Sequence, residues 1–350
     1  MLNQESKIVF PEHFGFCGGV AAADQLMSAV ALEAAGRVAV VGLHHIVHNR
    51  DVVQKHEANG VQFVDEVDAI PERSAVVISA HGVGPEVKHQ ILANGSEIFD
   101  ATCPLVVHTH KGVEHAREHG EKVIYVCQGK PGEVEKMHDE VAGFVGCLDY
   151  RADVEGEVIL DPIDRSYIEL HEDLAQVDGL LTENAKYRII TQTTLHADHC
   201  LAYREEIKRY IQGLQPHAEV SWARKGDVCH AVADRQRGVE QLVEIKPRHI
   251  IVATDPTSKN GRGYVDLAQK LVAKAGISAE VHAIANATEA QDLAGAEGLI
   301  AMTASASTPD EIITEITQSI GNCDPPEQKD QTFNLRDAKQ ITAKLRKLGR

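Results

Sequence analysis

Three of the seven cysteines share a local setting that is suited to binding a metal cluster. Cys17, Cys103 and Cys229 each end a loop and are followed by a helix-like stretch, where unpaired backbone N–H groups favour a thiolate. Thiolates hold iron–sulfur clusters, and three protein ligands would leave one iron open to a substrate oxygen. From spacing alone, such cysteines would more often be buried small hydrophobic residues. We interpret the remaining cysteines in that way: Cys127, Cys147, Cys200 and Cys323.

Two histidines, His48 and His81, follow predicted strands. The ends of strands are where α/β sheets place their ligand sites. An imidazole there can donate to phosphate oxygens and can deliver protons near neutral pH. Taken singly, each would more often be a hydrogen-bonded structural histidine. Two such motifs in one chain favour an anion site.

Three loops rich in hydroxyl and amide groups also follow predicted strands, at 191–195, 257–262 and 303–309. Such loops can bind phosphate through side-chain hydroxyls and through backbone N–H groups at a helix start. Helix capping is the alternative for any single loop, because Ser, Thr and Asn are the commonest caps. Three loops at strand ends together predict a shared anion site.

Short apolar runs alternate with helix-like segments along the chain. Runs of β-branched residues that are bounded by Gly, Pro or Asp and followed by amphipathic segments indicate parallel α/β units. The predicted buried strands are 37–43, 74–79, 122–127, 187–191, 249–253 and 297–303. The sequence therefore predicts an α/β fold in which three repeated units each offer one thiolate at a helix start.

Composition and charge limit the class of protein. A chain of 350 residues with 43% hydrophobic content can bury a core in two or three domains. Its formal charge of −17 argues against a nucleic-acid partner, because phosphate backbones need a basic surface. No run of 18 apolar residues and no signal or transit pattern are present, so we expect no membrane association and a cytoplasmic location.

The motifs, taken together, resemble those of the 4-hydroxy-3-methylbut-2-enyl diphosphate reductase family, the last enzyme of the methylerythritol phosphate route to isoprenoids. The resemblance spans nearly the whole chain, and its segments occur in the family's order. The matching segments are 15–20, 47–53, 79–83, 100–106, 191–195, 229–236 and 303–310.

The resemblance implies three α/β lobes, related by pseudo-threefold symmetry, with small and mostly parallel sheets around a central cluster. Cys17, Cys103 and Cys229 would hold a 4Fe-4S cluster with one open iron site. The expected lobes are 1–103, 104–222 with an acidic insertion at about 146–183, and 223–322, followed by a basic tail at 323–350. The strand at 7–16 is a candidate to pack with the third lobe, and the tail is expected to form a solvated helix.

The resemblance also implies an activity, the reductive removal of a hydroxyl group from 4-hydroxy-3-methylbut-2-enyl diphosphate. The products would be isopentenyl and dimethylallyl diphosphate, and a ferredoxin or flavodoxin would donate the electrons. Glu133 would relay protons, and Thr193 would lie near the hydroxymethyl end. The implied diphosphate contacts are His48, His81, Ser258, Asn260 and Ser307.

Two substitutions depart from the family's pattern at expected substrate contacts. Lys130, Pro131 and Gly132 precede Glu133 where the family has His-Pro-Glu, and Lys259 replaces a serine. Either lysine could supply a point charge to the substrate in place of the lost donor. Three alternatives follow: a paralogue that reductively dehydroxylates a different small anionic substrate, a non-catalytic iron–sulfur sensor, and a zinc or metal-free binding protein in which the cysteines are core thiols.

Overall fold

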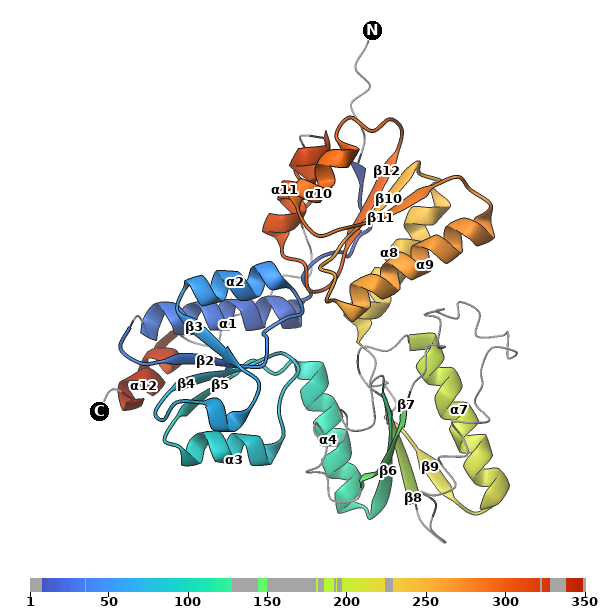
Figure 1. The fold of residues 1–350 in the computed structure, drawn as a ribbon. Coiled ribbons are helices and arrows are strands. Elements are labelled where there is room, and N and C mark those ends of the chain that lie inside the picture. The colour runs from blue at the N-terminus through green and yellow to red at the C-terminus, as the bar shows by residue number, and fades with distance from the viewer. Residues whose placement is uncertain are drawn as a thin grey trace. The chain divides into compact units, whose positions relative to one another are not determined.

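The protein is described by a computed structural model, which divides into two compact units. The first unit contains Met1–Gly82, Val87–Cys103 and Asp234–Arg350, and the second contains Val83–Glu86 and Pro104–Ala233. Figure 1 labels the helices and strands of both units. The structure describes residues 8–34, 36–127, 144–149, 181, 186–191, 193, 197–223, 229–321, 323–327 and 338–348.

One parallel sheet of the first unit has the strand order β3-β2-β4-β5. Its strands are β3 (Val61–Val64), β2 (Val40–Leu43), β4 (Ala75–Ile78) and β5 (Glu97–Asp100). The two central strands, β2 and β4, are buried along their whole length, which matches their continuous apolar sequences. The associated helices are α1 (Gly18–Ala34), α2 (Arg50–Ala58) and α3 (Pro85–Ala93).

A second parallel sheet of the first unit has the order β1-β12-β10-β11. Its strands are β1 (Ile8–Val9), β12 (Ile300–Ala304), β10 (His249–Ala253) and β11 (Glu280–Ile284). The central strands β10 and β12 are again fully buried, whereas β11 at the edge is only partly buried. The associated helices are α8 (His230–Glu244), α9 (Lys259–Ala275), α10 (Ala287–Ala290) and α11 (Asp310–Gly321).

The second unit contains a parallel sheet with the order β7-β6-β8-β9. Its strands are β7 (Phe144–Asp149), β6 (Glu121–Cys127), β8 (Lys186–Thr191) and β9 (Glu219–Ser221). The helices α4 (Pro104–Glu118) and α7 (Ala197–Leu214) belong to this unit. Cys200 on α7 is buried in the core of the unit, as predicted for that thiol.

The three sheets share one order of strands. In the sheets of β2 and β6, and among β10, β11 and β12, the first strand in sequence lies between the second and the third, and a further strand lies beside the third. In the sheet of β10, this fourth place is taken by β1 from the start of the chain. The predicted α/β class with small parallel sheets is confirmed, and each of the six predicted strands is present with small differences at its ends. No helix among the described residues combines the length and hydropathy that a membrane span requires.

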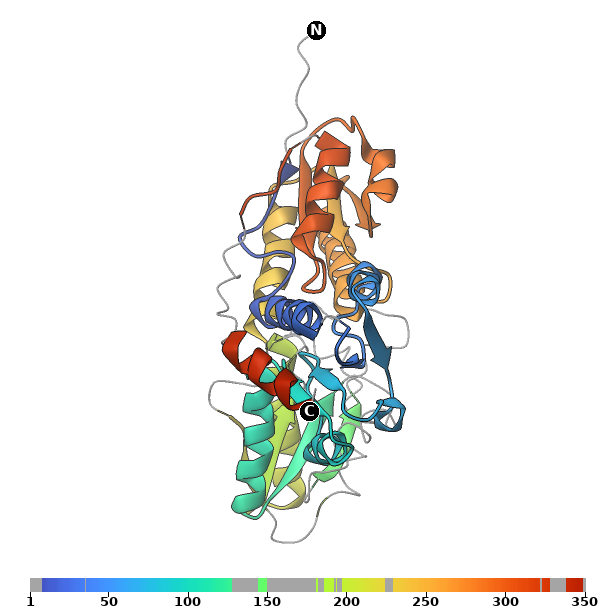
Figure 2. The ribbon, with the colours of Figure 1, turned by 90° about the vertical axis from the view of Figure 1, so that its left-hand side faces the viewer.

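The basic C-terminal helix α12 (Ala338–Leu348) packs against α1 and β5 of the first unit (Figures 1 and 2). Ile341, Leu345 and Leu348 are buried in the same core as α1. Lys344 donates to the backbone oxygen of Ile98 at 2.7 Å. The prediction of a solvated helix was therefore wrong for one face, because leucine and isoleucine at helical spacing form an apolar stripe that the basic residues obscured.

Candidate functional site

Each of the three candidate cysteines stands directly before a helix. Cys17 precedes α1, Cys103 precedes α4 and Cys229 precedes α8. All three side chains are half-buried. The predicted helix starts are confirmed, and at each one the first N–H groups of the helix favour a thiolate over a thiol.

Cys17 and Cys103 converge beside Gly19 in the first unit. A Cβ atom added to Gly19 would lie 2.9 Å from the Sγ of Cys103 and 4.0 Å from the Sγ of Cys17. Both sulfurs therefore border the space that the missing side chain leaves. Glycine is required at this helical position because of close approach, since any side chain would displace the sulfur of Cys103.

The loop before Cys17 is held by the buried guanidinium of Arg235 on α8. Its Nε donates to the backbone oxygen of Gly15 at 2.9 Å, and its Nη2 donates to that of Phe16 at 3.0 Å. Gly15 has a φ of 62°, a left-handed conformation that a glycine adopts without strain. The planar guanidinium thus orders the backbone that presents Cys17.

The loop before Cys103 is held at the end of β4. Its backbone N–H groups at Ala101 and Cys103 donate to the oxygens of Ile78 and Ala80, both at 3.0 Å. In the second unit, the N–H of Cys229 donates to the backbone oxygen of Thr193 at 2.5 Å. Thr193, a residue predicted for catalysis, is therefore a direct neighbour of a candidate ligand.

The two candidate histidines lie close together in the first unit. The ring centroids of His48 and His81 are 5.3 Å apart. Desolvation and, to a smaller extent, the neighbouring His48 and His44 together lower the pKa of His81 to about 4. His81 is nevertheless exposed to solvent, and at neutral pH its ring is uncharged with one N–H to donate.

Hydroxyl groups from two loops meet at the carboxyl ends of β10 and β12. Ser307 donates to the hydroxyl oxygen of Ser258 at 3.3 Å, and the hydroxyls of Ser305 and Ser307 are 3.0 Å apart. Ser258 is also the N-cap of α9, accepting from the N–H of Gly261 at 3.1 Å. Ser258 is therefore a helix cap, as the alternative predicted, and its hydroxyl oxygen also accepts a hydrogen bond from Ser307.

Two further predicted contacts follow Ser258 directly. Lys259 is the first residue of α9, and Asn260 is a half-buried residue of its first turn. The N-terminus of α9 carries a partial positive charge from the helix dipole. An anion beside Ser258 would therefore meet both hydroxyl donors and a favourable electrostatic field.

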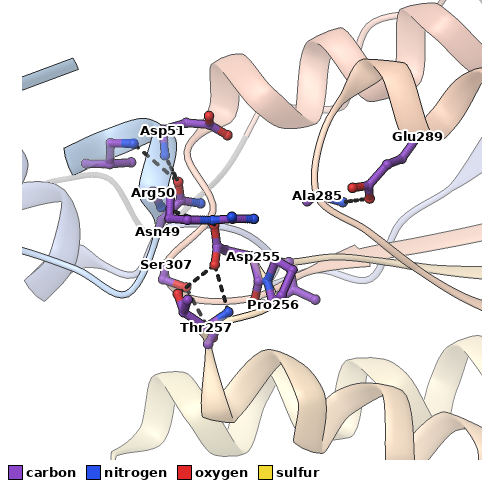
Figure 3. A network of polar contacts seen from close by, with 12 residues as sticks. Asn49, Arg50, Asp51, Asp255, Pro256, Thr257, Ala285, Glu289 and Ser307 are labelled. Atoms are coloured by element: carbon purple, nitrogen blue, oxygen red, sulfur yellow. Dashed lines mark hydrogen bonds and ion pairs between the residues drawn. The ribbon is translucent and has the colours of Figure 1, made fainter. Parts of the chain in front are cut away.

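The carboxylate of Asp255 joins the segment that follows His48 to the loop that carries Thr257 and Ser258 (Figure 3). Its Oδ2 accepts from the backbone N–H of Arg50 at 3.1 Å and from the Nε of Arg50 at 3.2 Å. Its Oδ1 accepts from the N–H and the hydroxyl of Thr257 at 2.7 and 2.6 Å. Desolvation raises the pKa of Asp255, but the hydrogen bonds from Thr257 and Arg50 outweigh it and hold that pKa below its ordinary value.

The structure thus places most of the predicted residues in two groups. The first unit brings together Cys17 with Cys103, His48 with His81, and Ser258 with Ser307, and the second unit brings Thr193 to Cys229. Lys130 and Glu133 lie outside the described residues, as does most of the predicted acidic insertion. Sequence reasoning missed Arg235 and Asp255, although Arg235 lies in the matching segment 229–236 and Asp255 directly precedes the predicted hydroxyl loop.

Comparisons with known proteins agree over most of the chain. A model of the family described as LytB protein matches residues 8–321. The chain is 33% identical over 303 residues to a 4-hydroxy-3-methylbut-2-enyl diphosphate reductase of Aeromonas hydrophila, with 86% of each chain covered. It is 32% identical over 312 residues to a relative of the same name from Methylococcus capsulatus, covering 89% of this chain and 88% of the relative.

Two solved structures share the fold. The E-1-hydroxy-2-methyl-but-2-enyl-4-diphosphate reductase of Plasmodium falciparum aligns with a TM-score of 0.69, 21% identity and 98% coverage of both chains. A structure of (E)-4-hydroxy-3-methyl-but-2-enyl diphosphate reductase aligns with a TM-score of 0.56 and 24% identity, covering 89% of this chain and 98% of the other. At these identities the two structures support the fold alone.

The first prediction concerns the close approach at Gly19. We expect Gly19→Ala to destabilise the protein by about 1–3 kcal/mol, because the new methyl group must displace the Cys103 side chain. Gly263→Ala on α9 is the matched control. It meets no atom within 4 Å and is expected to be neutral or to stabilise by about 0.4–1 kcal/mol. Urea unfolding measures both free energies, and equal effects would contradict the packing argument.

The second prediction concerns Asp255. We expect Asp255→Asn to cost about 1.5–3 kcal/mol at pH 7.5, because an amide nitrogen cannot accept the two Arg50 donors. The exposed Asp292→Asn serves as control. Because the folded-state pKa of Asp255 is depressed, its stabilisation is present at neutral pH and is lost as the pH falls through that value. Urea unfolding at a series of pH values from 7.5 to about 2.5 tests this, and a difference that stays undiminished at the acid end would refute it.

The third prediction concerns His81. Its lowered pKa means that the unfolded chain takes up a proton between about pH 6.5 and pH 4 while the folded protein does not. Wild-type stability is therefore expected to fall over this range by more than that of His81→Gln. Urea unfolding at pH 7.5 and pH 5.5 measures the two slopes, with the exposed His89→Gln as control. A His81→Gln slope equal to that of wild type would show that His81 titrates normally.

Proposed function

Since the chain belongs to the LytB protein family and is an oxidoreductase, we propose that it reduces 4-hydroxy-3-methylbut-2-enyl diphosphate. In this reaction the substrate takes up two electrons and two protons. Its C–O bond breaks, water leaves, and isopentenyl or dimethylallyl diphosphate remains. The observation that carries the proposal is the convergence of Cys17 and Cys103 beside Gly19, in a chain that matches the family from residue 8 to residue 321.

We propose that Cys17, Cys103 and Cys229 hold a 4Fe-4S cluster. Three observations support the fit: all are thiols directly before helices, their side chains are half-buried, and Gly19 leaves room beside two of the sulfurs. Such a cluster, when bound with one open iron, supplies electrons and a Lewis acid for the substrate oxygen. Arg235 and the backbone of β4 fix the loops that present two of the ligands.

The diphosphate group is proposed to bind the linked loops of the first unit. His48 and His81 would each donate one ring N–H, and Ser258 and Ser307 would donate hydroxyls. Asp255 would hold the segment that follows His48 close to Ser258, because it accepts hydrogen bonds from Arg50 and from Thr257. Asn260 and Lys259 would complete the contacts at the start of α9.

Protons for the leaving hydroxyl are proposed to come through Glu133, with Thr193 orienting the hydroxymethyl end. Thr193 is half-buried and accepts from the backbone of Cys229, which places it beside a ligand loop. Lys130 is proposed as a further substrate contact. Hydroxide is a poor leaving group, so a proton delivered at this position would lower the barrier to C–O cleavage.

We further propose a cytoplasmic location and an electron donor of the ferredoxin or flavodoxin type. A second candidate function rests on Lys259, which stands where the family has a serine. A cation at the start of α9 would strengthen binding of a substrate with greater negative charge than a diphosphate ester. On this candidate, the same chemistry would act on a different phosphorylated allylic alcohol.

The assay that tests the proposal is anaerobic. Purified protein with its iron and sulfide quantified is given a chemical reductant and 4-hydroxy-3-methylbut-2-enyl diphosphate, and the products are identified by mass spectrometry. We expect both isoprenoid diphosphates from wild type and from Cys323→Ala, a half-buried cysteine outside the site. Cys103→Ala is expected to lose iron and at least about 99% of the activity, a cost of nearly 3 kcal/mol in transition-state stabilisation.

Each outcome of this assay discriminates between functions. A protein that carries its cluster but forms neither product would refute the substrate, and turnover of another phosphorylated allylic alcohol would establish the second candidate. A protein that carries its cluster and reduces none of these substrates would fit a sensor. Unchanged iron content in Cys103→Ala would refute the assignment of that ligand.

A further inference from the structure

We propose that His249, Glu280 and His282 form a second metal site, which binds a divalent transition-metal ion such as Zn²⁺. Among the residues that the structure describes, these three bring one ligand atom each to within 4.8 Å of one another. His249 and Glu280 are the first residues of β10 and β11, and His282 is the third residue of β11. The proposal is independent of the proposed reaction.

The parallel register of the two strands builds this group. His249 is paired with Glu280, and Ile251 is paired with His282. Glu280 and His282 are two residues apart on one strand, so their side chains point to the same face of the sheet. In-register neighbours on parallel strands also share a face, which brings His249 to them. The backbone thus positions all three ligands without a loop.

The separations suit a tetrahedral ion. The Nδ1 of His249 lies 3.2 Å from the Nε2 of His282. The Oε2 of Glu280 lies 3.8 Å from the first nitrogen and 3.9 Å from the second. Ligand atoms about 2.0–2.1 Å from a tetrahedral Zn²⁺ are roughly 3.3 Å from one another. A small rotation of the glutamate side chain is enough to close the remaining difference.

The ligand types and their exposure also favour a transition metal. Two imidazoles and one carboxylate are a common set for Zn²⁺ and its neighbours, whereas Ca²⁺ and Mg²⁺ prefer oxygen ligands alone. The side chain of His249 is 10% exposed, that of His282 is 26% and that of Glu280 is 60%. One buried ligand gives a fixed anchor, and the exposed carboxylate leaves a path for the ion and a position for water.

A hydrogen-bonded histidine pair without an ion is the competing interpretation. The ring nitrogens at 3.2 Å fit an N–H···N contact as well as two metal ligands. That interpretation gives Glu280 only a long ion pair with each ring, because its oxygen lies beyond hydrogen-bonding distance of both nitrogens. An ion between the three groups would accommodate every ligand atom.

An ion here would stabilise the sheet and would not touch the substrate. Ser258 and Asp255 follow the other end of β10, and a strand of five residues spans about 16 Å. The ion would tie β11, an edge strand, to the buried β10. A ligand that binds only the folded state raises the unfolding temperature, so the expected effect is thermal.

Isothermal titration of the anaerobically purified, iron-containing protein with Zn²⁺ tests the proposal. We expect wild type to bind one Zn²⁺. Glu280→Gln should bind it at least about tenfold more weakly, and His282→Gln more weakly still. Zn²⁺ should raise the unfolding temperature of wild type and leave that of His282→Gln unchanged. Iron content is measured before and after titration, so that Zn²⁺ that replaces iron at cysteine thiols is not counted as binding to this site.

The matched control is His115→Gln/His119→Gln. These exposed histidines have ring centroids 3.9 Å apart, so they form a second pair of closely spaced imidazoles. Loss of Zn²⁺ binding in this control, or equal binding by wild type, Glu280→Gln and His282→Gln, would overturn the proposal. Because Glu280 is exposed, its substitution leaves the fold intact and keeps the test decisive even where a histidine variant is unstable.

Discussion

The carboxylate of Asp255 accepts hydrogen bonds from two segments that follow different sheets of the first unit. Arg50, the first residue of α2, donates from directly after the loop that carries His48, and Thr257 donates from the loop that carries Ser258. The carboxylate is 4% exposed, and the hydrogen bonds to its oxygens favour its ionised form by more than burial disfavours it. The hydrogen bonds of this one buried carboxylate therefore tie together the two segments that carry the proposed anion donors.

The positions of Cys17 and Cys103 depend on a different constraint, the space available beside Gly19. Gly19 allows two sulfurs to approach the first turn of α1, and Arg235 uses its guanidinium to gather the carbonyl oxygens that precede Cys17. Such a fork orders two successive peptide groups more firmly than one lysine ammonium could. Close packing and directional donors thus fix the loops of Cys17 and Cys103, so the proposed cluster would bind with a smaller loss of conformational entropy.

Features that depend on residues close together in the sequence were predictable, and features that depend on distant residues were not. Buried central strands such as β10 were predicted because both faces are apolar, and the cysteines were placed before helices by local signals alone. Edge strands such as β11 were missed, because charged and polar residues interrupt the apolar pattern. Asp255 was missed for another reason, since its partner Arg50 lies 205 residues away in the chain. Contacts of that length depend on topology, which no local pattern encodes.

The two ends of β10 present different functional groups, because the topology brings different segments together at each end. At the carboxyl end, the chain leaves the sheet through a loop into α9, so donors and backbone N–H groups gather for an anion. At the amino end, β10 and β11 begin side by side, so side chains from neighbouring strands meet at fixed spacing. His249 and His282 are 33 residues apart in sequence, and only the register joins them. The proposed anion site and the proposed cation site therefore lie at opposite ends of the same strand, about 16 Å apart, a distance at which solvent and salt weaken the interaction of their charges.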